Sequence, residues 1–194
     1  MIIKCYEEKH KYLLFIDVEF NGGDLVQFTG LLWIRIDDGV YQLMRSCNQY
    51  VATKVCYPFM EYTNITNTFL SENGIPLADV QRLVLDDFLG DIDLSDMQII
   101  SHGLRNDRLI LARNGINLQM VNGDPIDGYC TFNNARRLLN RRSHLTLVEL
   151  AQECGYYLHN AHNAFNDVWA SVSVYTFLRK VEHMQKEEER TANH

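Results

Sequence analysis

Residues 13–20 read Leu-Leu-Phe-Ile-Asp-Val-Glu-Phe, an apolar run that leads directly into two acidic residues, Asp17 and Glu19. Such a run predicts a strand buried at the centre of a sheet. Because side chains alternate along a strand, Asp17 and Glu19 point to the same face. Two carboxylates at a buried strand end repel each other and lose hydration, which is unfavourable unless a cation lies between them. A lone Asp-x-Glu also fits a strand end that reaches water, so the rest of the chain must decide.

Four further strands are expected after this one. Turn residues separate the next two apolar stretches from it and from each other, which predicts a three-stranded antiparallel meander. The later strands alternate with helices, and right-handed crossovers would place the first and fourth strands side by side. The fold class is therefore α/β, a mixed five-stranded sheet flanked by helices. The expected strands span residues 13–20, 25–36, 40–50, 97–101 and 129–132.

Helical spacing and capping residues predict the helices between and after these strands. Gly115 is expected to end the helix that follows residue 101, and Thr146 with Glu149 forms a capping box before another. The last helix has no Gly or Pro, and its charged end is expected to fray. The expected helices span residues 76–88, 133–139, 147–154 and 164 to beyond 178, with a charged tail at 186–194, and one more helix after residue 101 carries residues 107–114.

The composition is that of one globular domain covering residues 1–194, with its core at about 13–180. The chain has 194 residues, of which 46% are hydrophobic and 22% charged, enough for a full core. Its five cysteines are odd in number and scattered, which predicts reduced thiols and a cytoplasmic location. No apolar run suits a signal peptide or a membrane span, so no membrane partner is expected.

A net charge of −7 argues against a broad basic surface for long duplexes. It is compatible with a nucleic-acid enzyme, because bound metal ions can supply positive charge at the reaction centre. One basic cluster exists, and a solvated helix end explains it better than contacts with phosphates. It consists of Arg136, Arg137, Arg141 and Arg142. His102, after the fourth strand, is expected to orient its loop by a hydrogen bond.

Three more residues bear on the acidic pair of the first strand. Asp107 leads the apolar stripe of its helix, where a carboxylate is unusual without a partner. Asp167 lies in the first turn of the last helix. His162 can face the same point only if it lies before that helix, in the polar turn Asn160-Ala161-His162-Asn163, whose Asn163 is placed to cap the helix. Four carboxylates and one histidine without a basic residue suit two divalent metal ions.

This ordered set resembles the DEDDh-type 3′–5′ exonucleases, the DnaQ-like family with a ribonuclease H-like fold. Three segments carry the resemblance, which extends from about residue 13 to residue 178. They are Phe15-Ile16-Asp17-Val18-Glu19-Phe20, Ile100-Ser101-His102-Gly103-Leu104-Arg105-Asn106-Asp107 and His162-Asn163-Ala164-Phe165-Asn166-Asp167. The order of the three is specific, whereas each segment alone is not.

The resemblance implies a two-metal phosphodiester hydrolase. Two Mg²⁺ or Mn²⁺ ions would lie among Asp17, Glu19, Asp107 and Asp167, and His162 would take the proton of the attacking water. The implied partner is a single-stranded 3′ end, with nucleoside 5′-monophosphates as products. Residues of the loop after Glu19 would hold the terminal nucleotide, through backbone rather than through an aromatic side chain expected in the core. These are Phe20, Asn21 and Gly22.

The chain departs from the family pattern at Phe20, often Thr, and in the second segment at Gly103 and Asn106. These departures bear on substrate choice more than on the metal ligands. Two alternatives stay open: a catalytically silent nucleic-acid or protein-binding module, and an endonuclease of the same fold. The sequence does not distinguish RNA from DNA, nor a monomer from a homodimer.

Overall fold

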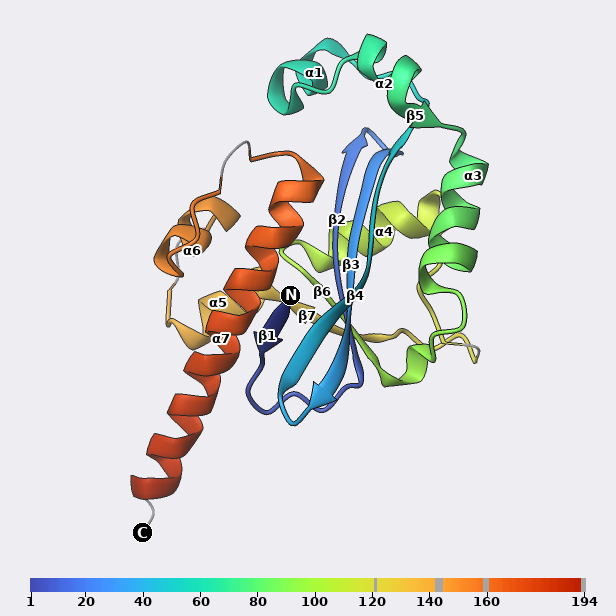
Figure 1. Ribbon diagram of the computed structural model, residues 1–194. Helices are drawn as coiled ribbons and strands as arrows, with labels where there is room; N and C mark the ends of the chain where they lie inside the picture. The colour runs from blue at the N-terminus through green and yellow to red at the C-terminus, as the bar shows by residue number, and fades with distance from the viewer. Residues whose placement is uncertain (121, 142–144, 159–160, 193–194) are drawn as a thin grey trace.

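In the computed structural model, a mixed sheet lies between two layers of helices (Figure 1). The structure describes residues 1–120, 122–141, 145–158 and 161–192. The strands are β1 (Ile2–Lys4), β2 (Tyr12–Asn21), β3 (Asp24–Asp37), β4 (Val40–Val51), β5 (Gly74–Ile75), β6 (Met97–Ser101) and β7 (Asp127–Cys130). The helices are α1 (Tyr57–Thr63), α2 (Asn67–Asn73), α3 (Leu77–Arg82), the π-helix η1 (Leu83–Leu89), the 3₁₀ turn η2 (Leu94–Asp96), α4 (Leu104–Arg113), α5 (Thr131–Leu138), α6 (Leu147–Glu153) and α7 (Ala164–Ala192).

The strand order across the sheet is β1-β4-β3-β2-β6-β7, and β5 pairs with the end of β4. Strands β2, β3 and β4 form the predicted antiparallel meander. Strand β6 runs parallel to β2, with Tyr12 opposite Met97 and Phe15 opposite Ile100. The expectation that the first and fourth predicted strands are neighbours is therefore confirmed, and β2 lies inside the sheet.

Alternation along β2 sends its apolar side chains into two separate cores. Leu13 and Phe15 are fully buried on the face covered by α5, α6 and α7. Leu14 and Ile16 are fully buried on the face covered by α3, η1 and α4. Burying each such side chain contributes about 1.5–3 kcal/mol. The strand is thereby fixed from both faces, and the orientation of its acidic residues is fixed with it.

The strand count differs from the prediction, because the described part of the sheet has seven strands rather than five. Strand β1 has three residues and β5 only two, too few for an alternating pattern to identify either. Two helices of seven residues each, α1 and α2, occupy a segment expected to be an interruption and a polar loop. They lie beyond one end of the sheet in Figure 1.

Several helix boundaries follow the predicted signals. Gly115 follows α4 with φ 76°, and the capping box of Thr146 and Glu149 is present at the start of α6. Two boundaries were wrong: Thr131 and Phe132 belong to α5 instead of the last strand, and α7 continues through Ala192 instead of fraying. An ion pair between Arg190 and Glu187 accompanies this last stretch of helix.

Buried polar groups fasten α7 to the sheet. The Tyr175 hydroxyl lies within hydrogen-bond distance of Glu8 Oε2 and, at 3.0 Å, of Gln98 Oε1. Arg179 Nε donates to the carbonyl oxygen of Tyr6. A satisfied polar network of this kind specifies one register between elements. The beginning of α7, which carries Asp167, is therefore held at a defined place on the sheet.

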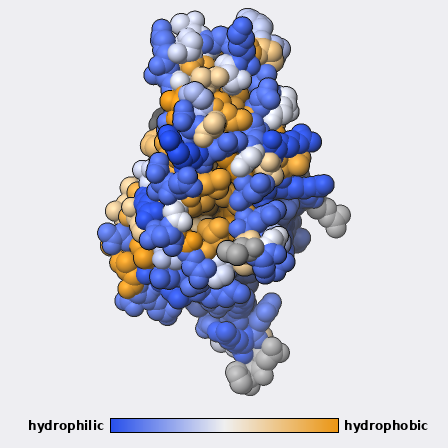
Figure 2. All heavy atoms as spheres, turned by 90° about the vertical axis from the view of Figure 1, so that its right-hand side faces the viewer, coloured by the Kyte–Doolittle hydropathy of each residue, from blue (hydrophilic) through white to orange (hydrophobic). Residues whose placement is uncertain are grey.

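The opposite face of the molecule exposes some apolar surface. Figure 2 shows hydrophobic residues, in orange, between hydrophilic ones on the face that α3 and η1 occupy. Partly buried residues at the rim of this core include Leu83, Leu85, Ile92 and Leu94. None of the helices in the described ranges is long and apolar enough to cross a membrane. The five cysteines are free thiols, as expected.

Candidate active site

The acidic residues of β2 lie where the sheet opens past the end of β6. The parallel pairing of β2 with β6 ends at Phe15, so Asp17 and Glu19 extend beyond it. On their other side they pair with Thr29 and Gln27 of β3. A strand that outruns its parallel neighbour leaves its side chains open to the helix that follows that neighbour. Here that helix is α4, which starts at Leu104 and carries Asp107.

Three of the predicted carboxylates come together directly. Oxygen atoms of Asp17, Glu19 and Asp167 all lie within 4.8 Å of one another. Asp107, 7% exposed in the first turn of α4, is not part of this trio but lies close enough to raise the pKa of Asp17. Its Oδ2 accepts a hydrogen bond from Ser101 Oγ at the end of β6. The structure thus gathers all four acids at one end of β2.

Electrostatics in this cluster favour protonation. Burial raises the pKa of Asp17 well above its ordinary value, and the carboxylates of Asp107, Asp167 and Glu19 raise it further. Burial, with Asp167 and Asp107, raises the pKa of Glu19 to about 8. Burial likewise raises the pKa of Asp107 to about 7 and that of Asp167 to about 6. The cluster without cations is therefore under repulsive strain, which bound positive charge would relieve.

Asp167 supplies a direct test of whether a metal ion fits. Its Oδ2 accepts from the backbone N–H of His162 at 3.0 Å, whereas its buried Oδ1 has no hydrogen-bond partner. A buried carboxylate oxygen without a donor is unfavourable unless a cation coordinates it. Oxygen ligands alone, as this set provides, are those that Mg²⁺ and Mn²⁺ prefer. The residues present fit a divalent metal ion.

His162 lies in the turn before α7, as its spacing from Asp167 required. It is half-buried, and its backbone is left-handed with φ 67°. Asn163 Oδ1 accepts from the N–H of Phe165, consistent with the predicted helix cap. Burial lowers the pKa of His162 below its ordinary value. The imidazole is thus kept neutral near pH 7, the state that accepts a proton. Asn160, placed in the same predicted turn, lies outside the described residues.

The loop after Glu19 has one feature that the alternation rule misjudged. A β-bulge between Glu19 and Phe20 shifts the register, and Phe20 is 38% exposed rather than in the core. Gly22 adopts φ 69°, which the tight turn requires. The Asn21 side chain accepts a hydrogen bond from Cys56 Sγ at 2.9 Å. The loop is thereby tied to the start of α1.

A group of hydrogen-bonded polar side chains lies on β3 and β4 beside the strand that carries Asp17 and Glu19, and the sequence analysis did not identify it. Thr29 and Gln27 of β3 both donate to Asn48 Oδ1 of β4, and Gln27 Oε1 accepts from the N–H of Ala164 at the start of α7. The signal was present, since Gln27 and Thr29 interrupt an otherwise apolar strand on the face of Asp17. These hydrogen bonds connect β3 to the helix that carries Asp167.

Tyr62 of α1 was also missed. Its ring centroid lies 3.9 Å from that of His162, with 32° between the ring planes. No periodic pattern marks it, because α1 is a short helix in a segment expected to be irregular.

His102 and the arginine cluster both lie outside the carboxylate cluster and take the structural roles expected of them. His102 orients its loop as expected: Nδ1 lies 3.0 Å from Thr131 Oγ1 and Nε2 lies 3.3 Å from the carbonyl oxygen of Leu145. In the basic cluster, Arg137 pairs with Glu182 and Arg141 with Glu153, which fits an exposed helix end. Arg142 lies outside the described residues.

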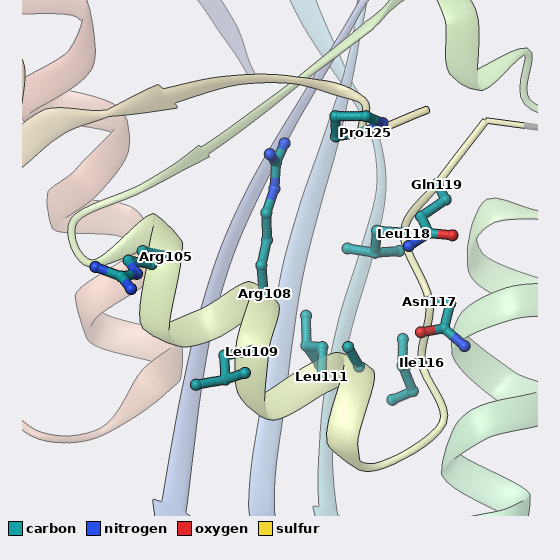
Figure 3. A pocket seen from close by; sticks show the side chains of 10 residues that line it. Arg105, Arg108, Leu109, Leu111, Ile116, Asn117, Leu118, Gln119 and Pro125 are labelled. Atoms are coloured by element: carbon teal, nitrogen blue, oxygen red, sulfur yellow. The ribbon is translucent and has the colours of Figure 1, made fainter. Parts of the chain in front are cut away.

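A cavity of about 350 Å³ lies between α4 and the segment 116–125 that follows it (Figure 3). Its described lining is largely apolar and contains none of the four acids. The lining residues include Arg105, Arg108, Leu109, Leu111, Ile116, Leu118 and Pro125. This cavity and the carboxylate cluster are therefore separate parts of the described structure.

The raised pKa values predict how stability depends on pH in metal-free protein. An acid whose folded-state pKa is raised stabilises the fold below its unfolded pKa, and this stabilisation is lost as pH rises through the folded value. With Glu19 at about 8, Asp107 at about 7 and Asp167 at about 6, the Tm in EDTA should fall as pH rises from about 4.5 to 8. Scanning fluorimetry at each pH measures this.

Saturating Mg²⁺ or Mn²⁺ should remove most of that fall, because ions that bind only the folded state stabilise it by mass action. Glu19→Gln should flatten the upper end of the EDTA profile, whereas the surface variant Asp38→Asn should not. A Tm in EDTA that is constant or rises over this range would contradict the charge distribution described above.

The sheet order, the two helical layers and the site at the end of β2 define a ribonuclease H-like fold of the kind found in exonucleases. No protein-family model matches the sequence, and no curated protein matches it. Solved structures do match. Escherichia coli exonuclease I in complex with a dT13 oligonucleotide is 16% identical, over 92% of this chain and 43% of its own, with a TM-score of 0.69.

Two other exonucleases share the fold over most of both chains. Exonuclease X in complex with 5′ overhanging duplex DNA is 16% identical, over 87% of this chain and 91% of its own, with a TM-score of 0.60. A 3′-exonuclease that recognises the histone mRNA stem-loop is 11% identical, over 93% and 84%, with a TM-score of 0.62. This chain spans about two fifths of the exonuclease I chain. At these identities, the likeness establishes the fold.

Proposed function

We propose that this chain is a metal-dependent 3′–5′ exonuclease domain that removes nucleoside 5′-monophosphates from single-stranded DNA or RNA. The observation that carries the proposal is the carboxylate trio, whose Asp167 Oδ1 is buried without a hydrogen-bond partner. The shared fold with three exonucleases that act on nucleic acids supports it. The free thiols of all five cysteines suit a cytoplasmic location.

In this proposal Asp17, Glu19, Asp107 and Asp167 hold two divalent ions, Mg²⁺ or Mn²⁺. When bound, such ions polarise the scissile phosphate, activate water and stabilise the leaving oxygen. His162 accepts the proton of the attacking water at its imidazole. The N–H of His162 and Ser101 Oγ orient two of the carboxylates, Asp167 and Asp107, through the hydrogen bonds described above.

The loop at Phe20, Asn21 and Gly22 is proposed to hold the terminal nucleotide. Asn114 fixes this loop: its Oδ1 accepts from the N–H of Leu25, and its Nδ2 donates to the carbonyl oxygen of Gly23. With Asn21 also tied to Cys56, the loop borders the site beside Glu19. Because the loop closes one side of the site, the end of a nucleic-acid chain can enter it more readily than a continuous strand. The exposed ring of Phe20 can contact the terminal base or sugar.

The expected result is that a linear single strand is shortened from its 3′ end while the circular form of the same strand survives. Incubation with Mg²⁺ and denaturing electrophoresis of a 5′-labelled strand would show a descending ladder, and the same strand labelled uniformly would release labelled mononucleotides. Matched RNA and DNA oligomers, digested side by side, determine the preferred sugar.

The alternatives give different patterns in the same assay. Rapid loss of the circle would contradict the exonuclease proposal and support an endonuclease. Binding of the oligomer without any cleavage, with either metal, would support the silent binding module. EDTA is the control, because removing the metal should stop cleavage of every substrate.

A further inference from the structure

Tyr62 lies in the last turn of α1, one hundred residues before His162 in the sequence, yet the two rings are in contact. Their centroids are 3.9 Å apart and their planes are tilted by 32°. Tyr62 is 61% exposed, so the contact is not a consequence of burial in a core. Partial desolvation and the carboxylates of Glu19 and Asp167 raise the pKa of its hydroxyl. The phenol therefore stands beside the carboxylate cluster.

The imidazole of His162 has few other restraints. Within the described ranges, the backbone N–H of His162 donates to Asp167, whereas its ring makes no hydrogen bond and no ion pair. The backbone of His162 is in the left-handed region, with φ 67°. A residue other than glycine keeps this conformation only where its surroundings hold it. The ring of Tyr62 is the group that packs against this imidazole.

Helix α1 is a fixed support rather than a loose flap. The Asn67 side chain makes two hydrogen bonds with Val55, which precedes α1. It accepts from the N–H of Val55 at 2.8 Å and donates to the carbonyl oxygen of Val55 at 3.0 Å. Val55, Ile65 and Leu70 form a small core beneath it with Val26 of β3. The position of Tyr62 is thus set by the scaffold before any substrate binds.

We propose that Tyr62 is a positioning residue, whose ring packs against the imidazole of His162 and holds it beside the carboxylate cluster in the orientation needed to accept a proton. This inference rests on the proposed exonuclease function, in which His162 is the base. A base that is already oriented loses less conformational freedom on the way to the transition state. Tyr62 therefore acts on turnover through His162.

An exposed aromatic ring can also stack on a nucleobase of the substrate. Kinetic measurements distinguish such a stacking role of Tyr62 from the positioning role proposed here. A positioning role lowers kcat and leaves KM for the oligonucleotide nearly unchanged. A stacking role raises KM. Tyr62→Leu should lower kcat about tenfold, the scale of one lost ring contact, with KM within about twofold. Tyr62→Phe keeps the ring and should stay near wild type.

A double-mutant cycle makes the coupling explicit. If Tyr62 acts through the imidazole, Tyr62→Leu should have no further effect on kcat in the His162→Ala background. The matched control is Tyr57→Leu, since Tyr57 is a comparably exposed tyrosine of the same helix, 69% exposed, and has no ring contact with His162 in the described structure. An equal loss of kcat in both backgrounds would overturn the proposal, as would a rise in KM alone.

A measurement without catalysis separates this proposal from the proposed function. In metal-free protein, the Cε1–H resonance of His162 in a ¹H–¹³C correlation spectrum should carry a ring-current shift from Tyr62. Tyr62→Leu should move it, whereas Tyr62→Phe and Tyr57→Leu should not. If the wild-type protein cleaves no nucleic acid, the proposed function fails, and this spectrum still decides whether Tyr62 holds the ring. An unchanged resonance in Tyr62→Leu overturns the contact itself.

Discussion

Asp167→Asn is expected to abolish nuclease turnover together with the metal-induced rise in Tm. The side chain keeps its size, and its remaining oxygen can still accept from the N–H of His162. The amide nitrogen, however, would replace one oxygen of the cluster and repel a cation. Activity should fall by at least about a thousandfold, because a lost ligand removes metal-ion catalysis at the reaction centre. The measurement is mononucleotide release with Mg²⁺, beside thermal melting with and without Mg²⁺.

The control for this variant is Asp91→Asn. Asp91 is an exposed carboxylate whose pair with Arg45 lies at the surface, so its loss should leave both activity and the metal-induced shift unchanged. Asp17→Asn should resemble Asp167→Asn, since both acids belong to the trio. A metal-induced Tm rise in Asp167→Asn equal to that of wild type would place the metal elsewhere.

The sequence was sufficient to predict the sheet's central part, for a physical reason. Strand β2 is buried on both faces and therefore carries an apolar run, while β3, β4 and β6 are long or apolar enough to show their own patterns. The acids stand out against such runs because carboxylates are rarely buried without a partner. That contrast marks Asp17, Glu19 and Asp107 as candidate metal ligands in the sequence alone.

What escaped prediction depends on short elements and on local register. Strand β5 and helix α1 are too short for hydrophobic periodicity, so the support for Tyr62 could not be anticipated. The exposure of Phe20 depends on a bulge that the alternation rule does not include. The polar contacts of Gln27 with Asn48 and Ala164 join three elements, and only the assembled sheet shows them.

His162→Ala is expected to separate the proton acceptor from the metal ligands. Loss of a general base should lower kcat by roughly a hundred- to ten-thousand-fold. The metal-induced rise in Tm should persist, because the contact of residue 162 with Asp167 is through its backbone N–H, which alanine retains. Activity is measured with saturating Mg²⁺, and metal binding is followed by melting in the same buffers.

The pH profile supplies the decisive readout for this residue. A base accepts a proton only when neutral, so wild-type kcat should climb as pH rises through the pKa of His162, which burial places below its ordinary value. His162→Ala should lack this limb. Because residue 162 has φ 67°, His162→Asn serves as a second variant, since asparagine tolerates the left-handed region better than alanine. If both variants turn over near the wild-type rate with the limb intact, His162 only shapes the turn before α7. If both are slow, keep the metal-induced shift and show a flat profile, the imidazole is the proton acceptor.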